Sequence, residues 1–417
     1  MRIYIKKNCH LIKGAKNAAI YDLNKNLVYS INQEGLQLIT ELTKKNNKKL
    51  NREELKYINS LLKLELVDKN AQSPNDTILD RNKVDFKIDF AWLELTDRCN
   101  LNCVHCYGEF GCPKENKGEE LTIEQWKKII KQLKNHDCNS VQFIGGEPLI
   151  YEGFNQLLEY TYNIGIQNIT VFTNATLIDD ERVKLFKKYN VKIRISVYGA
   201  NQKVHDSVTG VKGSFKRNAE ALRKLKQNQI DASIAIVIMH ENEGELENLE
   251  KYIKKIGYDY TGYDVIRKNN YLQENKHSIT NYDILKYKYI YKPEFYTSEK
   301  SFINNHYKNP CWNNKIDICS NGDVIPCIFS RDEIIGNVVN DTLEEIFEKA
   351  KKYWTITKEN IDVCKDCEYR YCCYDCRPLA KGINGNIYSH YPRCCYNPYE
   401  GKWKDIREIT KEIENKK

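Results

Sequence analysis

The chain has 417 residues, of which 41% are hydrophobic and 29% charged, and its formal net charge is +8. This balance is typical of a globular protein of about two or three domains, and no stretch is apolar for long enough to cross a membrane. The N-terminus lacks a signal-peptide core and no basic stripe alternates with aromatic residues, so we expect a cytoplasmic protein that binds neither a membrane nor nucleic acid.

Residues 1–75 are predicted to form a small domain of their own. Residues 18–31 have the pattern of a β-hairpin around Asn24, and leucines and isoleucines over residues 36–62 recur at helical spacing. The run LELVDK predicts a returning strand. Hairpin, helices and strand together suggest a winged-helix-like fold. The polar run AQSPNDTILDRN that follows is predicted to be a linker.

Strands and helices alternate from residue 87 to residue 267. Repeated βα units imply an α/β fold, a parallel sheet with helices outside it, and six units are too few for a closed eight-unit barrel. The run TIEQWKKIIKQLK is amphipathic, and Thr122 with Gln125 forms a capping box at its start. The strand candidates are FAWLELT, SVQFIGG, NITVFTN, KIRISVYG, ASIAIVIM and TGYDVIR.

Two motifs follow the first two strand candidates. The first is a CxxxCxxC triplet made by Cys99, Cys103 and Cys106. Three thiolates on a four-iron cluster leave one iron free to bind a small molecule, which makes a reactive cluster. The second motif is a turn made by Gly145, Gly146, Glu147 and Pro148. Because parallel strands end at the same edge of a sheet, we expect the triplet and the turn to lie close together.

In order and spacing, these two motifs resemble those of the radical S-adenosylmethionine (SAM) enzymes. The resemblance implies a partial (β/α)6 TIM-like barrel, in which the free iron binds SAM and reductive cleavage yields a 5′-deoxyadenosyl radical. It also implies that the glycine-rich turn holds the SAM amino group and that His105 packs near the adenine. Asn174 and Ser196 would contact the ribose, and Arg267 the SAM carboxylate. Each of these last three could equally be a satisfied polar group at a strand end.

Ten of the sixteen cysteines lie between residues 311 and 395. Their spacing resembles the SPASM extension of radical SAM enzymes, which implies two auxiliary clusters within a cysteine-rich domain at residues 301–417. Residues 268–300 would connect it to the barrel. The first cluster would be held by Cys311, Cys327 and Cys376, with Cys319 as a fourth ligand or with an open iron. The second would be held by Cys364, Cys367, Cys373 and Cys394. Cys372 and Cys395 remain alternatives to their neighbours, and a zinc site remains the alternative to a cluster.

The run CKDCEYRYCCYDCRP is most like the peptide maturases of grasp-with-SPASM systems, which are radical SAM/SPASM enzymes. The resemblance implies SAM and three [4Fe-4S] clusters as cofactors, and a thioether or carbon–carbon cross-link in a ribosomal precursor peptide as the product. Residues 1–75 would recognise the peptide. Further partners would be a reductant such as flavodoxin or ferredoxin and an ATP-grasp ligase in the same pathway. The alternatives are a peptide epimerase, a sulfatase-type formylglycine-generating maturase, and a zinc-binding peptide adaptor.

Overall fold

The computed structural model describes residues 1–44, 48–70, 84–108, 110, 119–267, 277, 292–405, 407–408 and 411. The chain divides into two compact units. The first comprises Met1–Asp85, Ile290–Asn313 and Trp354–Lys417, and the second comprises Phe86–Tyr289 and Asn314–Tyr353. The predicted linker and most of the predicted connecting segment lie outside the described residues. No helix in the described part of the chain is both long and apolar enough to span a membrane.

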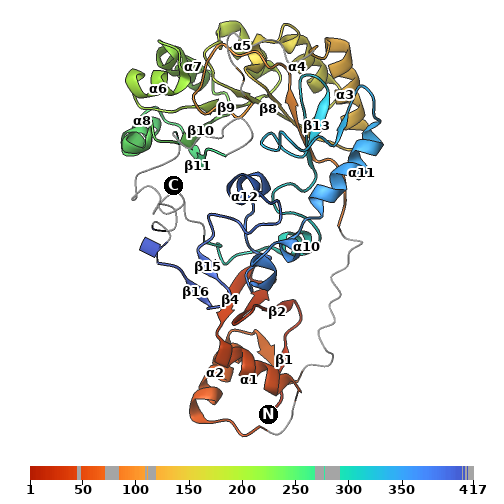
Figure 1. Cartoon of the computed structure of the whole chain (residues 1–417), viewed down its shortest axis with the longest axis vertical. Helices are drawn as coiled ribbons and strands as arrows, with labels where there is room; N and C mark the ends of the chain where they lie inside the picture. The colour runs from red at the N-terminus through yellow and green to blue at the C-terminus, as the bar shows by residue number, and fades with distance from the viewer. Residues whose placement is uncertain are drawn as a thin grey trace. The chain divides into compact units, whose positions relative to one another are not determined.

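The second unit is built on a sheet to which the described residues contribute nine strands (Figure 1). Six of them run parallel in chain order, which confirms the predicted parallel sheet. They are β6 (Phe90–Glu94), β7 (Ser140–Ile144), β8 (Asn168–Thr173), β9 (Lys192–Ser196), β10 (Ala232–Ile238) and β11 (Tyr260–Val265).

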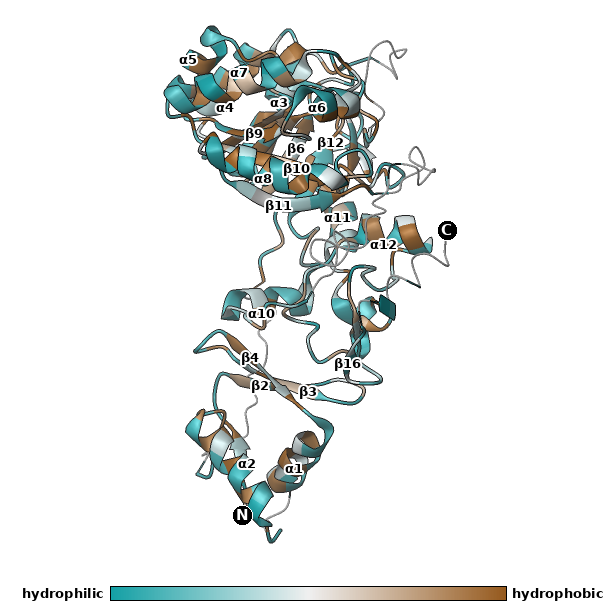
Figure 2. Cartoon of the chain, turned by 90° about the vertical axis from the view of Figure 1, so that its left-hand side faces the viewer, coloured by the Kyte–Doolittle hydropathy of each residue, from teal (hydrophilic) through white to brown (hydrophobic). Residues whose placement is uncertain are grey.

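Helices cover the outer side of this curved sheet (Figure 1). They are α3 (Ile123–Asn135), α4 (Phe154–Asn163), α5 (Asp180–Lys188), α6 (Gln202–Thr209), α7 (Ser214–Gln227) and α8 (Leu246–Lys255), with the 3-10 helices η2 (Pro148–Ile150) and η3 (Glu243–Glu245) between them. The predicted capping box of α3 is present, and Trp126, Ile129 and Ile130 are buried on its inner face. Figure 2 shows the same division, with apolar strands beneath helices whose outer faces are hydrophilic.

Three further strands extend the sheet beyond β6, and the sequence did not predict them. They are β12 (Lys315–Ile318), β13 (Asp323–Ile325) and β14 (Gly336–Asn337), followed by α11 (Leu343–Trp354). Strand β12 pairs in parallel with β6, where it satisfies backbone groups that an open sheet edge leaves unpaired. Residues Asn314–Tyr353 are therefore grouped with the barrel strands, whereas the sequence assigns them to the cysteine-rich domain. The predicted domain boundaries stay predictions.

The first unit begins with the predicted hairpin, helices and returning strand. Its elements are β1 (Tyr4–Ile5), β2 (Cys9–Lys13), β3 (Ala18–Asp22), β4 (Leu27–Ile31), α1 (Gln33–Lys44), α2 (Arg52–Lys63) and β5 (Val67–Asp68). Strands β2, β3 and β4 form an antiparallel sheet, and β5 pairs with β1. The hairpin turn contains Asn26, whose φ of +57° is one that asparagine tolerates better than most residues.

The sheet β2–β4 has two buried faces. Ile20 and Ile31 pack in one core with α1 and α2. Tyr21 and Val28 pack on the other side, in a core that contains Phe302 and several aromatic residues from 369–396. The N-terminal segment therefore shares a core with the cysteine-rich region. The remaining elements of this unit are α10 (Glu299–Tyr307), the 3-10 helices η6 (Lys358–Asn360) and η7 (Cys364–Asp366), α12 (Arg377–Asn384), β15 (Tyr396–Asn397) and β16 (Lys402–Trp403).

Candidate active site

The cysteine triplet lies in the loop after β6, at the edge of the sheet where its parallel strands end. Its members are Cys99, Cys103 and Cys106. The backbone N–H of Leu101 donates to Cys99 Sγ at 3.4 Å, and that of Phe110 donates to Cys106 Sγ at 3.2 Å. Burial raises the pKa of the Cys99 thiol to about 12, so a bound metal would have to supply the charge that stabilises its thiolate. Three thiols, two of which accept a hydrogen bond from a backbone N–H, fit a three-ligand iron–sulfur cluster.

The glycine-rich turn after β7 packs directly on the backbone that leads into the triplet. Gly146 N donates to Thr96 O at 2.8 Å, and Glu147 N donates to Arg98 O at 2.9 Å. A Cβ atom on Gly145, which has a φ of +137°, would lie 2.5 Å from Thr96 O, and one on Gly146 would lie 2.2 Å from Arg98 O. Glycine is therefore required at both positions by contact with the triplet's own loop.

Glu147 joins the ends of β7 and β8. Its carboxylate accepts hydrogen bonds from Leu149 N at 3.1 Å, from Thr173 Oγ1 at 2.7 Å and from Asn174 N at 2.9 Å. The side chain is fully buried, and this burial raises the pKa of Glu147 to about 7 against the effect of those donors. The structure gives Glu147 a role in holding the loops together, and its predicted contact with SAM stays a prediction.

The structure brings Asn174 and Ser196 together at the ends of β8 and β9. Asn218 Nδ2 donates to the backbone oxygens of Asn174 at 3.0 Å and of Ser196 at 3.1 Å. Asn174 Nδ2 also donates to Asn100 Oδ1 at 2.9 Å and lies 4.0 Å from Cys99 Sγ. Asn174 thus borders the cysteine triplet. The ribose contacts predicted for Asn174 and Ser196 stay predictions.

His105 lies between the last two cysteines of the triplet. Its ring meets that of Tyr198 edge to face, with the ring centroids 4.7 Å apart. Its Nδ1 atom is buried and has no hydrogen-bond partner among the described residues, and burial lowers the pKa of His105 to about 4. A neutral imidazole with an unused nitrogen can accept or donate one hydrogen bond to a ligand. Its predicted position near an adenine stays a prediction.

A buried ion pair that the sequence did not predict lies near the triplet. Both terminal nitrogens of Arg331 donate to the carboxylate of Glu94 at 2.7 Å. The guanidinium carbon of Arg331 also lies 5.2 Å from the ring centroid of Tyr107. Burial raises the pKa of Glu94, and Arg331 opposes this increase. Arg267, the predicted SAM-carboxylate contact, pairs instead with Asp264 at 2.9 Å, so that assignment stays a prediction.

The four predicted ligands of the second auxiliary cluster line a single cavity in the first unit. They are Cys364, Cys367, Cys373 and Cys394. Cys372 does not line the cavity. Its Sγ atom instead accepts a hydrogen bond from Tyr21 Oη at 3.6 Å. Cys395 does not line it either. Four thiols around one space fit a four-iron cluster. The placement favours Cys373 and Cys394 over their neighbours, and the assignments stay predictions.

Lys358 is a second residue that the sequence analysis missed. Its side chain lines the same cavity, is 2% exposed, and pairs with Asp375 at 3.1 Å. Burial raises the pKa of Cys364, whereas the nearby Lys358 lowers it. A buried cation beside several thiols favours their thiolate forms, which are the forms that bind metal.

The predicted ligands of the first auxiliary cluster are divided between the two units. Cys311 and Cys376 belong to the first unit, and Cys319 and Cys327 to the second. Their grouping around one cluster stays a prediction.

Comparison with known protein families agrees with this geometry. The model of the radical SAM superfamily matches residues 93–253, and that of the SPASM iron–sulfur cluster-binding domain matches residues 311–368. The chain is a radical SAM protein with a SPASM domain. Membership implies a SAM-binding [4Fe-4S] cluster and auxiliary clusters, and the two thiol sets described above fit such groups.

Curated relatives match the chain over different lengths. The antilisterial bacteriocin subtilosin biosynthesis protein AlbA of Bacillus subtilis (strain 168) is 27% identical over 81% of this chain and 78% of its own length. The sporulation killing factor maturation protein SkfB of the same strain is 32% identical over 40% of this chain and 39% of its own. The mycofactocin maturase MftC of Mycolicibacterium smegmatis is 34% identical over 42% of this chain and 43% of its own.

Solved structures show the same fold. SuiB of Streptococcus suis bound to precursor peptide SuiA matches 93% of this chain and 98% of its own, with a TM-score of 0.58 and 13% identity. Native anSMEcpe with bound AdoMet and Cp18Cys peptide matches 78% of this chain and 96% of its own, with a TM-score of 0.54 and 19% identity. These matches confirm the predicted fold class.

Proposed function

We propose that this protein is a radical SAM maturase that installs a thioether or carbon–carbon cross-link in a ribosomally made precursor peptide. The observation that carries the proposal is the pair of thiol sets, the triplet after β6 and the four cysteines around one cavity, in a chain whose relatives include AlbA, SkfB and MftC. When bound, the groups they fit would supply a 5′-deoxyadenosyl radical at the first set and an electron acceptor at the second.

The chain's own residues position these groups and exclude water from them. Glu147 fixes the loops that carry the triplet, because it bonds the ends of β7 and β8 together. Asn174 and Tyr198 border the triplet, and both are held by surrounding contacts. Lys358 places a buried positive charge beside the four-cysteine cavity. Rigid, buried surroundings of this kind keep a reactive radical away from solvent.

The proposal includes three partners and a compartment. Residues 1–75 would bind the precursor peptide, a flavodoxin or ferredoxin would supply electrons, and an ATP-grasp ligase would act in the same pathway. SuiB, which has the same fold, has been solved with its precursor peptide SuiA. A cytoplasmic location is proposed because thiols at this density persist as metal ligands in a reducing compartment.

The proposal predicts that the triplet is essential for SAM cleavage. Simultaneous replacement of Cys99, Cys103 and Cys106 by alanine should abolish 5′-deoxyadenosine production, measured by chromatography on anaerobically purified protein with SAM and dithionite. Cys138→Ala is the matched control, since Cys138 is also a buried cysteine but precedes β7, at the opposite end of the strand from the glycine-rich turn. Substantial turnover by the triple variant would overturn the site assignment.

Product mass separates the proposed reaction from epimerisation. A cross-link removes two hydrogen atoms from the peptide, whereas epimerisation leaves its mass unchanged. Iron and sulfide near twelve per chain, as three such clusters require, would exclude the zinc-adaptor alternative. The precursor peptide used as substrate in this assay would be identified among the small open reading frames beside the gene.

A further inference from the structure

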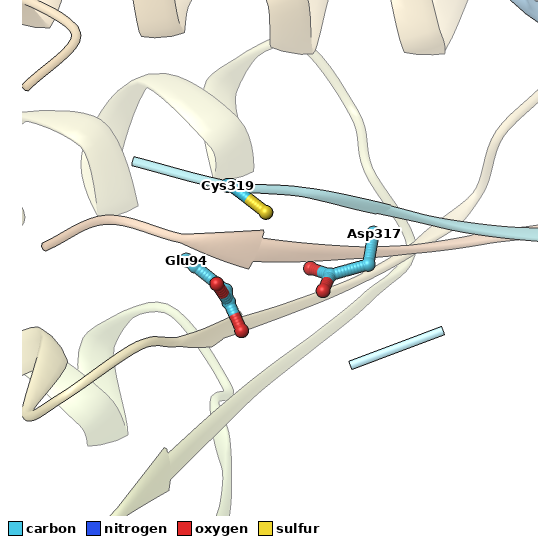
Figure 3. A group of neighbouring side chains, drawn as sticks. All are labelled: Glu94, Asp317 and Cys319. Atoms are coloured by element: carbon cyan, nitrogen blue, oxygen red, sulfur yellow. The ribbon is translucent and has the colours of Figure 1, made fainter. Parts of the chain in front are cut away.

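A group of potential metal ligands lies inside the second unit and includes only one of the predicted cluster ligands. Glu94 ends β6, Asp317 lies on the neighbouring β12, and Cys319 follows β12 (Figure 3). One ligand atom of each lies within 4.8 Å of those of the other two. Figure 3 shows the three side chains pointing toward one another. Glu94 and Asp317 are both fully buried.

Asp317 is the member that the surrounding protein leaves unsatisfied. Neither of its carboxylate oxygens has a hydrogen-bond partner among the described residues, although its exposed fraction is 0%. Burying an unpaired carboxylate costs several kcal/mol, so such groups are normally paired or bound to a metal. The carboxyl group therefore requires a partner that the described protein atoms do not provide.

The charges around this group leave room for a divalent cation. Arg331 donates to Glu94 and, at 3.4 Å, to Cys319 Sγ. With Glu94, Asp317 and a Cys319 thiolate ionised, Arg331 neutralises only one of three negative charges. Glu94 Oε1 also accepts a hydrogen bond from Tyr107 Oη at 3.4 Å, but Oε2 has a lone pair that its bond to Arg331 does not use, so the ion pair does not prevent Glu94 from binding a metal.

We propose that Glu94, Asp317 and Cys319 bind a single divalent transition-metal ion, zinc(II) by preference, separate from the iron–sulfur clusters. Two carboxylates and one thiolate form a donor set that zinc accepts, and zinc lies about 2.0–2.3 Å from such ligands. Ligand atoms spaced as observed can reach that geometry through small side-chain movements. Three protein ligands leave a fourth position for water or a substrate heteroatom. Cys319 then belongs to this site and is not the fourth ligand of an auxiliary cluster.

The proposal is tested by metal analysis of the reconstituted holoenzyme. The protein is loaded with ZnCl2 after anaerobic cluster reconstitution, freed of excess metal on a desalting column, and analysed for zinc, iron and sulfide. We expect about one zinc per chain beside the cluster iron. Zinc-edge X-ray absorption should show one sulfur ligand, with oxygen ligands completing the shell.

Two variants should remove this zinc and leave the clusters intact. Asp317→Asn, which is nearly the same size as the native residue, and Cys319→Ser should each reduce bound zinc at least tenfold with iron and sulfide unchanged. Cys138→Ser should keep both metals, since Cys138 is buried and its Sγ donates a hydrogen bond to Ser140 O at 3.4 Å.

Three results would overturn the proposal. Loss of about four iron atoms per chain from the Cys319→Ser protein would show that Cys319 is a cluster ligand. A zinc ion surrounded by three or four sulfurs in the wild type would place the metal in a cysteine cage instead. Absence of bound zinc from the wild type would mean that Arg331 is the only cation that offsets the negative charge of Glu94, Asp317 and Cys319. The absorption spectrum needs no variant, so the proposal remains testable if a variant fails to fold.

Discussion

Cys372 and Cys373 are adjacent in the sequence but lie in different surroundings. Cys373 lines the four-cysteine cavity, whereas Cys372 Sγ contacts Tyr21 Oη at 3.6 Å and donates to Tyr369 O at 3.3 Å. Their consecutive positions made the sequence ambiguous, because both satisfy part of the spacing pattern. Only the fold of the loop shows which side chain faces the cavity.

The two cysteines therefore form a matched pair for mutagenesis. Cys373→Ala should lose about four iron atoms per chain, because it removes one of four thiols around the cavity. Cys372→Ala should keep the iron and lose about 1 kcal/mol or less of stability, since Tyr21 retains its bond to Glu368 O. Iron and sulfide assays on both variants, with thermal unfolding, measure this difference. Equal iron loss in both variants would contradict the assignment.

At the residue scale, the metal-binding thiols are evident from the sequence, whereas the buried charged side chains are not. The triplet and the four cavity cysteines have spacings that can be read directly from the chain. The pair between Glu94 and Arg331 joins residues 237 positions apart, so no local pattern connects them. A carboxylate at the end of the otherwise apolar run FAWLE was the one available signal for Glu94. Asp317 likewise occupies a buried strand position that apolar residues usually fill.

At the scale of elements, the turn after β7 gives the sharpest prediction. Gly146→Ala would place a Cβ atom 2.2 Å from the carbonyl oxygen of Arg98, so the turn could not keep its contact with the triplet loop. We expect at least a tenfold loss of SAM affinity, measured by equilibrium dialysis on reconstituted protein. Gly244→Ala is the control, because nothing lies within 4 Å of the added atom there. Unchanged SAM binding in Gly146→Ala would contradict this account of the turn.

Elements with a strong local pattern were predicted from the sequence. The capping box and apolar face of α3, the hairpin β3–β4 and the six parallel strands each follow from periodicity and end signals. Strands β12, β13 and β14 were missed because they are short and lie among cysteines whose spacing dominated the interpretation. Their placement depends on the open edge of β6, which is a property of the folded sheet.

At the scale of the whole molecule, the first unit combines segments from both ends of the chain. The sheet β2–β4 shares one core with aromatic residues of the cysteine-rich region, and cavity cysteines pack against that core. The sequence predicted an N-terminal domain that stands alone, since a local pattern does not reveal that the second face of its sheet is also buried. Val28 and Tyr21 mark that face.

Removal of residues 1–75 should therefore affect metal content as well as peptide binding. The truncated protein should lose about four iron atoms per chain, because its cavity cysteines lose the core that supports them. Leu55→Ser is the control, since Leu55 is 45% exposed and its replacement should leave the iron unchanged. Iron and sulfide assays after anaerobic reconstitution measure both proteins. Full iron content in the truncated form would show that the N-terminal segment is independent of the cavity.

The pairing of β12 with β6 has a consequence for biosynthesis. A ribosome completes β6 long before it reaches Lys315, and at about 5–20 residues per second the nascent sheet waits on the order of ten seconds or more for its neighbour. During that delay the backbone of β6 is open to pairing with another chain. Chaperones or cofactor-loading proteins that bind the nascent chain would therefore act in the interval before β12 is synthesised, when covering β6 prevents its pairing with another chain.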